Sequence, residues 1–238
     1  MLERTSTTSP NRLLARMSAE DRARLDPHFE PIQLRIKQVL LKPNTPIEYV
    51  YFLESGLASV VATSSDGRRL EVGLYGREGM GSSAILLGDD QSPHEHFIQI
   101  AGAGLRIRVE NLREAIAQSP SLNGLLLKYL RTFQLQVTQT ALSNGNFTLT
   151  ERLARWLLMC HDRIDGDEIP ITHEFLGVML AVRRSGVTLA IQTLEGAQVI
   201  KARRGCIILR DREKLEEIAG GSYGPAEAAY ERLIGPMR

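Results

Sequence analysis

The sequence predicts an α+β chain in which a roll of short strands is followed by one long helix and a C-terminal unit of short helices and a hairpin. Three observations support this class: β-prone segments broken by turn residues, a helical period after Ser119-Pro120, and two amphipathic stretches after Thr172. The predicted parts are a strand-rich domain at 1–118, the long helix at 119–145, a C-terminal domain at 146–219 and a tail at 220–238.

Seven segments of the first domain are rich in β-branched and aromatic residues, which is typical of strands. They span residues 32–36, 39–41, 49–53, 57–63, 70–75, 97–100 and 105–109. Turn signals separate them, among them Lys42-Pro43-Asn44 and the glycine-rich run at 76–81. Many short strands at this spacing indicate an antiparallel sandwich or jelly roll.

The helical period after Ser119-Pro120 continues to about Asn144 without interruption. Its apolar positions step by four, three, four and three, as in the seam of a coiled coil, at Leu126, Leu130, Phe133, Val137 and Thr140. One interpretation is that this seam pairs two subunits in a homodimer. The other is that the helix lies on its own domain, and two heptads do not decide between them.

A second domain begins after Asn144-Gly145-Asn146, where the turn residues end the long helix. The pattern Thr148-x-x-Glu151 is a capping box that opens a new helix, and Trp156 is expected to anchor its core. Cys160 and His161 are adjacent on that helix and therefore point in different directions, so they do not form a catalytic pair. Since the sequence also has no phosphate-loop, nucleophile-elbow or zinc-hydrolase motif, we predict no catalytic residues and no enzyme.

The next two helices have the spacing of a helix-turn-helix. Thr172 is a good N-cap for the first, whose apolar face is formed by Phe175, Leu176, Met179 and Leu180. The second repeats apolar residues at Val187, Ala190, Ile191 and Leu194. Gly177 would let the helices approach each other, and Val182 would fill the angle between them.

The solvent face of the second helix is suited to DNA. Arginine can bond guanine in the major groove, serine can hold a phosphate, and leucine can touch a thymine methyl group. The residues on this face are Arg183, Arg184, Ser185, Gly186, Thr188, Leu189 and Gln192, and Gly186 would allow close approach of the backbone. For an Arg-Arg pair alone, a solvated charged face is the simpler interpretation.

A basic hairpin follows and favours the DNA interpretation. Residues 199–203 and 206–210 have strand character around the turn Arg204-Gly205. From residue 183 to 214 there are eight basic residues against three acidic ones: Arg183, Arg184, Lys201, Arg203, Arg204, Arg210, Arg212 and Lys214 against Glu195, Asp211 and Glu213. A recognition helix with a basic wing, including Lys201, Arg203 and Arg204, predicts binding to double-stranded DNA.

Composition agrees with a globular protein and limits its partners. Hydrophobic residues make up 43% of the 238, no apolar run reaches the roughly 18 residues of a membrane span, and the N-terminus does not resemble an export signal. Cys160 and Cys206 are the only cysteines, which excludes a four-cysteine iron-sulfur cluster within one chain. We therefore expect a cytoplasmic protein without a cofactor, whose net charge of +1 requires any nucleic acid to meet a local patch.

The string THEFLGVMLAVRRSGVT at 172–188 is similar to the helix-turn-helix of the Crp/Fnr family of bacterial transcription regulators, and nearly the whole chain resembles that family. The resemblance implies a cyclic-nucleotide-binding-like β-roll that acts as sensor, a dimerisation helix (with Leu126, Leu130, Phe133 and Val137) and a winged helix-turn-helix. It further implies a homodimer on a two-fold symmetric DNA site, with RNA polymerase as a further partner. By position, Arg184, Ser185 and Leu189 are its main base contacts, with Arg183 and Thr188 beside them and Thr172 also at the DNA.

The effector pocket departs from the family pattern. Cyclic-nucleotide binders of the family carry a glutamate for the ribose and an Arg-Ser or Arg-Thr pair for the phosphate. Residues 81–86 lack the glutamate and residues 91–96 lack the arginine, so cyclic AMP is not expected and the small-molecule effector is unknown. Pocket candidates are Gly79, Gly81, Ser82, Ser83 and Ser92. Two alternatives stay open: a cyclic-nucleotide-gated regulator with a non-standard pocket, and a protein-interaction module.

His94, Glu95 and His96 could begin a metal site, because two histidines and a carboxylate are suitable ligands. A closed site needs further ligands, and none is evident nearby in the sequence. We predict no metal.

Overall fold

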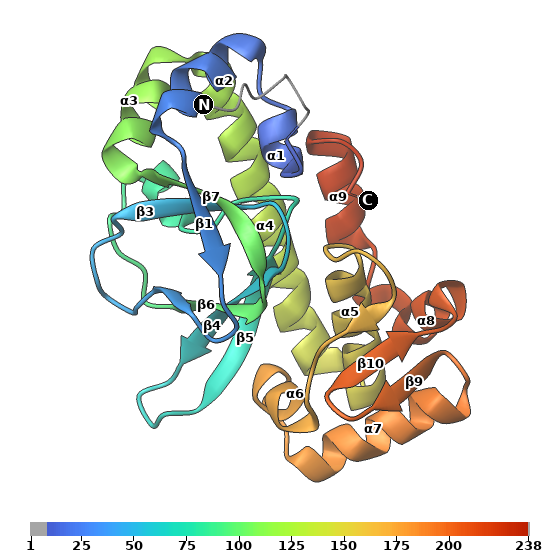
Figure 1. Ribbon diagram of the computed structural model, residues 1–238. Coiled ribbons are helices and arrows are strands. Elements are labelled where there is room, and N and C mark those ends of the chain that lie inside the picture. The colour runs from blue at the N-terminus through green and yellow to red at the C-terminus, as the bar shows by residue number, and fades with distance from the viewer. Residues whose placement is uncertain (1–8, 238) are drawn as a thin grey trace.

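The structure is a computed structural model that describes residues 9–237 (Figure 1). Its first domain contains seven strands, with short helical elements before, between and after them. The helical elements are α1 (Arg12–Ala15), α2 (Ala19–Leu25), η1 (Asp26–His28), η2 (Ser83–Leu87) and α3 (Val109–Gln118). The strands are β1 (Glu30–Leu34), β2 (Val39–Leu41), β3 (Tyr49–Leu53), β4 (Leu57–Thr63), β5 (Arg69–Tyr75), β6 (Glu95–Ile100) and β7 (Gly102–Arg108).

The strands form two antiparallel sheets, in the orders β1-β7-β3 and β2-β6-β4-β5. Phe52 of β3 pairs with Leu105 of β7, and both side chains are buried in the core of the domain. All seven predicted strands are present, and the α+β class is confirmed. The helices α1, α2 and α3 were not predicted, because α1 and α2 have only four and seven residues and show too little periodicity.

The long helix α4 (Pro120–Asn146) begins where predicted, with the Ser119 hydroxyl accepting from Leu122 N at 3.2 Å. It lies along the first domain (Figure 1). The side chain of Gln136 accepts from Leu74 N at 2.8 Å and donates to Leu74 O at 3.1 Å, which fastens the helix to β5. On the face that carries Gln136, α4 therefore lies on its own domain, as the second interpretation predicted.

The predicted coiled-coil seam is only partly covered within the single chain. Leu126 and Leu130 are buried in the single chain, and Phe133 and Val137 are half-buried. The first two therefore have little surface left for a partner subunit. The periodicity is correct, and at Leu126 and Leu130 it reflects burial within the chain, while the large apolar residues that α4 exposes are Leu127 and Leu142.

The C-terminal domain contains helices α5 (Leu149–His161), α6 (His173–Met179), α7 (Arg184–Gly196) and α8 (Arg212–Ala219). Its strands β8 (Glu168–Ile169), β9 (Ile200–Arg203) and β10 (Cys206–Leu209) form an antiparallel sheet in the order β8-β10-β9. The predicted capping box is present: Thr148 N donates to Glu151 Oε2 at 2.6 Å, and Glu151 N donates back to Thr148 Oγ1 at 3.4 Å.

The two domains pack against each other through a shared apolar cluster. The rings of Phe97 on β6 and Phe175 on α6 lie 5.8 Å apart, edge to face. Trp156, the one tryptophan of the sequence, is buried there and donates from Nε1 to Glu71 Oε1 on β5 at 2.7 Å. The C-terminal domain is therefore docked on the β-roll rather than linked to it by α4 alone.

The sequence assigned no element to the tail, but its described residues form η3 (Gly220–Ser222) and α9 (Pro225–Leu233). Helix α9 starts at Pro225, directly after Gly224, whose N–H donates to Glu227 Oε2 at 3.0 Å. It packs along α4 (Figure 1), and the side chains of Tyr230 and Met237 are buried. Between Ser9 and Met237 there is no helix whose length and apolar character would suffice to cross a membrane.

Candidate nucleic-acid interface

Helices α6 and α7 form the predicted helix-turn-helix. Thr172 caps α6, its hydroxyl accepting from Phe175 N at 3.2 Å. Leu176 and Met179 on α6, and Val187 and Leu194 on α7, are buried in the domain core. The apolar stripes that the sequence showed are thus the inner faces of both helices, and the other faces are left to solvent.

The turn between the helices depends on Gly177. A β-carbon at this position would lie 3.0 Å from Val182 O, which is tighter than an ordinary contact. Val182 N donates to Gly177 O at 2.9 Å, so the chain turns directly over the glycine. Ala181 takes a positive φ of 51° in the same turn. The predicted close approach of the helices at Gly177 is confirmed.

The start of α7 presents unpaired basic side chains. Arg183 is the N-cap of the helix, and Arg183, Arg184 and Ser185 are exposed. Leu189 follows one turn later with 66% of its surface accessible, although it is a large apolar residue. None of the ion pairs found between Ser9 and Met237 includes either arginine, so both guanidinium groups are available to a ligand.

Three other candidates for DNA contact already have intramolecular roles. Thr172 is exposed, but its hydroxyl caps α6. Thr188 is half-buried, and its hydroxyl donates to Arg184 O at 3.1 Å. At Gly186 a β-carbon would lie 3.1 Å from Cδ2 of Leu149, so this glycine faces α5. Its small size serves packing within the domain, in contrast to the expected approach of the backbone to DNA.

The hairpin of β9 and β10 forms beside α7. Arg203 pairs with Cys206 across a turn in which Gly205 has a φ of 73°. Ala202 N donates to Glu195 Oε1 at 2.8 Å, which fixes β9 to α7. The side chains of Lys201, Arg203 and Arg204 are exposed, with Lys201 Nζ 3.7 Å from Glu195 Oε1. The hairpin that carries these three exposed cations lies beside α7 (Figure 1).

The basic patch is smaller than the sequence count suggested. Arg212 lies half-buried in ion pairs with Asp162 at 2.7 Å and Glu216 at 2.8 Å. Lys214 Nζ donates to Ala197 O at 3.0 Å. These two cations contribute to the structure of the domain, since their partners are its own carboxylates and carbonyl. The available charge is therefore concentrated at the start of α7 and in the hairpin.

A cavity of about 550 Å³ lies between the β-roll and α4. Ser82, Ser83 and Ser92 line it, as expected of effector-pocket residues. Gly79 and Gly81 do not line the cavity. They lie against aromatic rings instead: a β-carbon on Gly79 would collide with the ring of Tyr129, and one on Gly81 with the ring of Tyr75. Both glycines are needed for packing of the loop, which is a correction to their expected role.

The sequence prediction missed the histidines and the helix residues of this cavity. His94 and His96 line it from the strand side, and Phe133, Val137 and Thr138 line it from α4. Burial lowers the pKa of His96 to about 3 and also lowers the pKa of His94, so both imidazoles are neutral at pH 7. The inward position of His96 could have been found from strand alternation, but its partners on α4 could not.

The electrostatics of the cavity do not match a cyclic phosphate. Among its lining residues in the described chain, Arg131 alone carries a charge, and its side chain is exposed on α4. The inner wall offers three hydroxyls and neutral imidazoles. His96 Nδ1 is buried and has no hydrogen-bond partner within residues 9–237. A phosphate buried against this inner wall would need a cation there.

Comparison with known proteins places this domain in a family. Residues 151–218 match the family described as the Crp-like helix-turn-helix domain. No curated protein sequence matches the chain. Among the similar solved structures described below, one is named as a putative transcriptional regulator and another as a global regulator.

Solved structures share the fold over most of the chain. A putative transcriptional regulator of the Crp/Fnr family from Eubacterium rectale has a TM-score of 0.67 at 16% identity, over 85% of this chain and 95% of that one. FixK2 from Bradyrhizobium japonicum has a TM-score of 0.69 at 18% identity, over 81% and 98%. The c-di-GMP-responsive global regulator CLP from Xanthomonas campestris has a TM-score of 0.64 at 18% identity, over 81% and 99%. The chain therefore has the fold of the Crp/Fnr transcription regulators and carries their Crp-like helix-turn-helix domain in residues 151–218.

Proposed function

We propose that the protein is a homodimeric transcription regulator that binds a two-fold symmetric DNA site through α7 and the β9–β10 hairpin. The observation that carries the proposal is the start of α7, where Arg183, Arg184 and Ser185 are exposed without ion pairs within residues 9–237, on a helix to which a cationic hairpin is fixed at Glu195. In a helix-turn-helix, the residues at the start of the second helix contact base edges in the major groove.

The chemistry of α7 assigns distinct roles to its residues. Arg184 is the candidate for a bidentate bond to guanine O6 and N7, and Leu189 for contact with a thymine methyl group. Arg183 and Ser185 flank Arg184 and are suited to phosphate oxygens or a neighbouring base. An apolar side chain as exposed as that of Leu189 is costly in water, and a groove contact would cover it.

The hairpin supplies the sequence-independent part of the affinity. Lys201, Arg203 and Arg204 present cations that can neutralise phosphates and release bound counterions. Since these contacts are made to the backbone, they position the domain without selecting bases.

The proposed dimer uses the outer face of α4. Leu127 and Leu142 are 39% and 46% exposed, whereas the neighbouring Leu126 and Leu130 are buried against the β-roll. A second copy of the helix would cover them, and the two winged domains would then address half-sites about 34 Å apart. A protein that binds DNA in this way acts in the cytoplasm, and RNA polymerase is the partner through which it would affect transcription.

The cavity between the β-roll and α4 is the proposed effector site. Ser82, Ser83 and Ser92 offer hydroxyls, and the neutral imidazoles of His94 and His96 line the same cavity. These groups fit a ligand that bears hydrogen-bonding groups and no buried phosphate. Calorimetry with cyclic AMP and cyclic GMP tests this, because tight binding of either would support a cyclic-nucleotide-gated regulator with a non-standard pocket.

Selection of bound genomic fragments, followed by gel shifts at physiological salt, tests the DNA-binding function. We expect a recurring two-fold symmetric site that is bound at least about 1,000-fold more tightly than random DNA. A protein-interaction module with a basic hairpin would show only weak binding that is blind to sequence. Light scattering on the same sample measures whether the chain is a dimer.

A further inference from the structure

The C-terminal segment 220–237, called the clasp below, contacts all three other parts of the chain. Helix α9 packs along α4, and Gln139 Nε2 on α4 donates to Gly221 O at 2.8 Å. Tyr223 OH donates to Asp162 Oδ2 at 2.7 Å, directly after α5 of the winged domain. Tyr230 OH donates to Glu78 O at 2.6 Å, in the glycine-rich loop of the β-roll. The family match ends at residue 218, before this segment.

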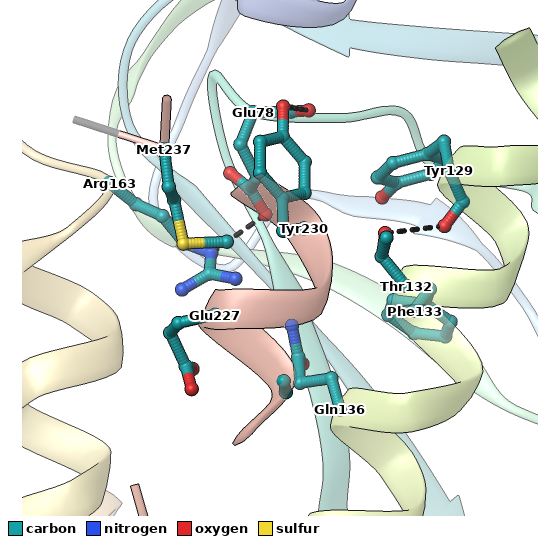
Figure 2. A pocket seen from close by; sticks show the side chains of 10 residues that line it. Glu78, Tyr129, Thr132, Phe133, Gln136, Arg163, Glu227, Tyr230 and Met237 are labelled. Atoms are coloured by element: carbon teal, nitrogen blue, oxygen red, sulfur yellow. Dashed lines mark hydrogen bonds and ion pairs between the residues drawn. The ribbon is translucent and has the colours of Figure 1, made fainter. Parts of the chain in front are cut away.

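Beneath the clasp, the β-roll and the winged domain are joined by a buried ion pair. Arg163 Nε lies 2.7 Å from Glu78 Oε1, and the two side chains are 1% and 3% exposed. Arg163 NH1 also donates to Met159 O at 2.7 Å, and Gly76 N donates to Glu78 Oε2 at 2.9 Å. Figure 2 shows Tyr230, Glu227 and Met237 gathered around this pair. The clasp thus excludes water from the charges that connect the domains.

The clasp does not cover the proposed DNA surface. Arg183, Arg184 and Leu189 on α7 and Arg204 in the hairpin are exposed while the winged domain is docked. A segment that blocked DNA binding would bury these residues. The geometry therefore favours a positioning role, in which the docked state holds each recognition surface in a set orientation to α4.

We propose that the clasp, through Tyr223 and Tyr230, fixes the winged domain on the β-roll and thereby preorganises the two recognition surfaces of a dimer for a site with two half-sites. The proposal rests on the proposed DNA-binding function. When the two domains of a dimer are held in register, the second half-site is bound at a high effective concentration. When they are free to move, that advantage is reduced by the cost of orienting them.

The test compares the full-length chain with the variant Tyr223→Phe/Tyr230→Phe, which keeps both rings and removes the two hydroxyls. The control is Tyr49→Phe on β3, outside the clasp. Acrylamide quenching of Trp156 fluorescence reports docking, since this single tryptophan is 4% exposed at the domain interface. Binding is measured on DNA with two half-sites and on DNA with one.

We expect stronger quenching of Trp156 in the clasp variant and a loss of about tenfold or more on two half-sites, against less than about threefold on one. Loss of folded protein alone would lower both affinities by the same factor. Equal losses on the two DNAs, or unchanged quenching, would overturn the proposal. If circular dichroism shows that the double variant does not fold, Tyr230→Phe alone is judged by the same criteria.

The outcome separates this proposal from the proposed function. If the parent chain binds no DNA, the DNA-binding function fails, and quenching alone decides whether residues 220–237 hold the winged domain in place. A parent that binds DNA normally, with unchanged quenching in the variant, refutes the clasp and leaves the DNA-binding function intact.

Discussion

Glu71 makes the stability of the protein depend on pH in a direction opposite to that of most carboxylates. It lies on β5 at the domain interface, where Oε1 accepts from Trp156 Nε1 at 2.7 Å and Oε2 has no partner within residues 9–237. Burial raises the pKa of Glu71 from 4.5 to about 7. Between these values the folded state holds a proton that the unfolded state has lost, so stability falls as pH rises.

The change Glu71→Gln should remove this dependence, because glutamine keeps the acceptor for Trp156 and does not ionise. At about 1.4 kcal/mol per pH unit, the group costs the parent about 3 kcal/mol between pH 4.5 and pH 8. We expect the variant to match the parent near pH 4.5 and to become more stable than it, by up to about that amount, at pH 8.

Urea unfolding followed by circular dichroism, at intervals between pH 4.5 and pH 8, measures the difference between the two proteins. The other titrating groups are the same in both proteins, so their contributions to the pH dependence cancel in the difference. The exposed Glu110 on α3 serves as control through Glu110→Gln. Parallel stability curves for parent and Glu71→Gln would refute the argument, because they would mean that the buried carboxyl titrates as it does in the unfolded chain.

Four further changes have defined outcomes. Arg184→Ala should lower affinity for the selected site by about 10-fold to 100-fold and affect random DNA less, in fluorescence anisotropy titrations; equal losses would contradict the base contact. Arg204→Ala should weaken binding to both DNAs and reduce the slope of log affinity against log salt by about one, and an unchanged slope would exclude a phosphate contact. Leu127→Glu should convert a dimer to a monomer in light scattering, whereas a persistent dimer would exclude the outer face of α4. His96→Gln should make the protein more resistant to acid. Burial lowers the pKa of His96 to about 3, so below pH 6.5 the unfolded state binds a proton that the folded state does not, and this destabilises the parent but not the variant. Identical unfolding of both proteins from pH 4 to pH 7 would count against this.

The sequence predicted the features that depend on neighbouring residues. The strand segments, the start of α4, the capping box at Thr148 and the helix-turn-helix around Gly177 all arise from interactions within a few positions along the chain. Periodicity also showed which apolar residues of α4 share one face of the helix.

Periodicity did not show which partner would cover that apolar stripe. An intramolecular sheet and a second helix both bury residues spaced by three and four, so Leu126 and Leu130 fitted either. The same limit applies to the glycines. Gly79 and Gly186 resemble residues of a ligand-binding turn and a DNA contact, but the atoms that they accommodate belong to Tyr129 and Leu149, which are distant in the sequence.

By itself, then, the sequence determined the fold class, the order of the domains and the basic helix and hairpin, because local hydrogen bonding and binary patterning specify these elements. Only the tertiary structure decided how they are joined. The Glu78–Arg163 pair spans 85 positions and the Tyr230–Glu78 bond spans 152, and these contacts form only after distant segments are packed together. The docking of the winged domain, the cavity between the β-roll and α4, and the packing of the C-terminal helix all depend on such contacts.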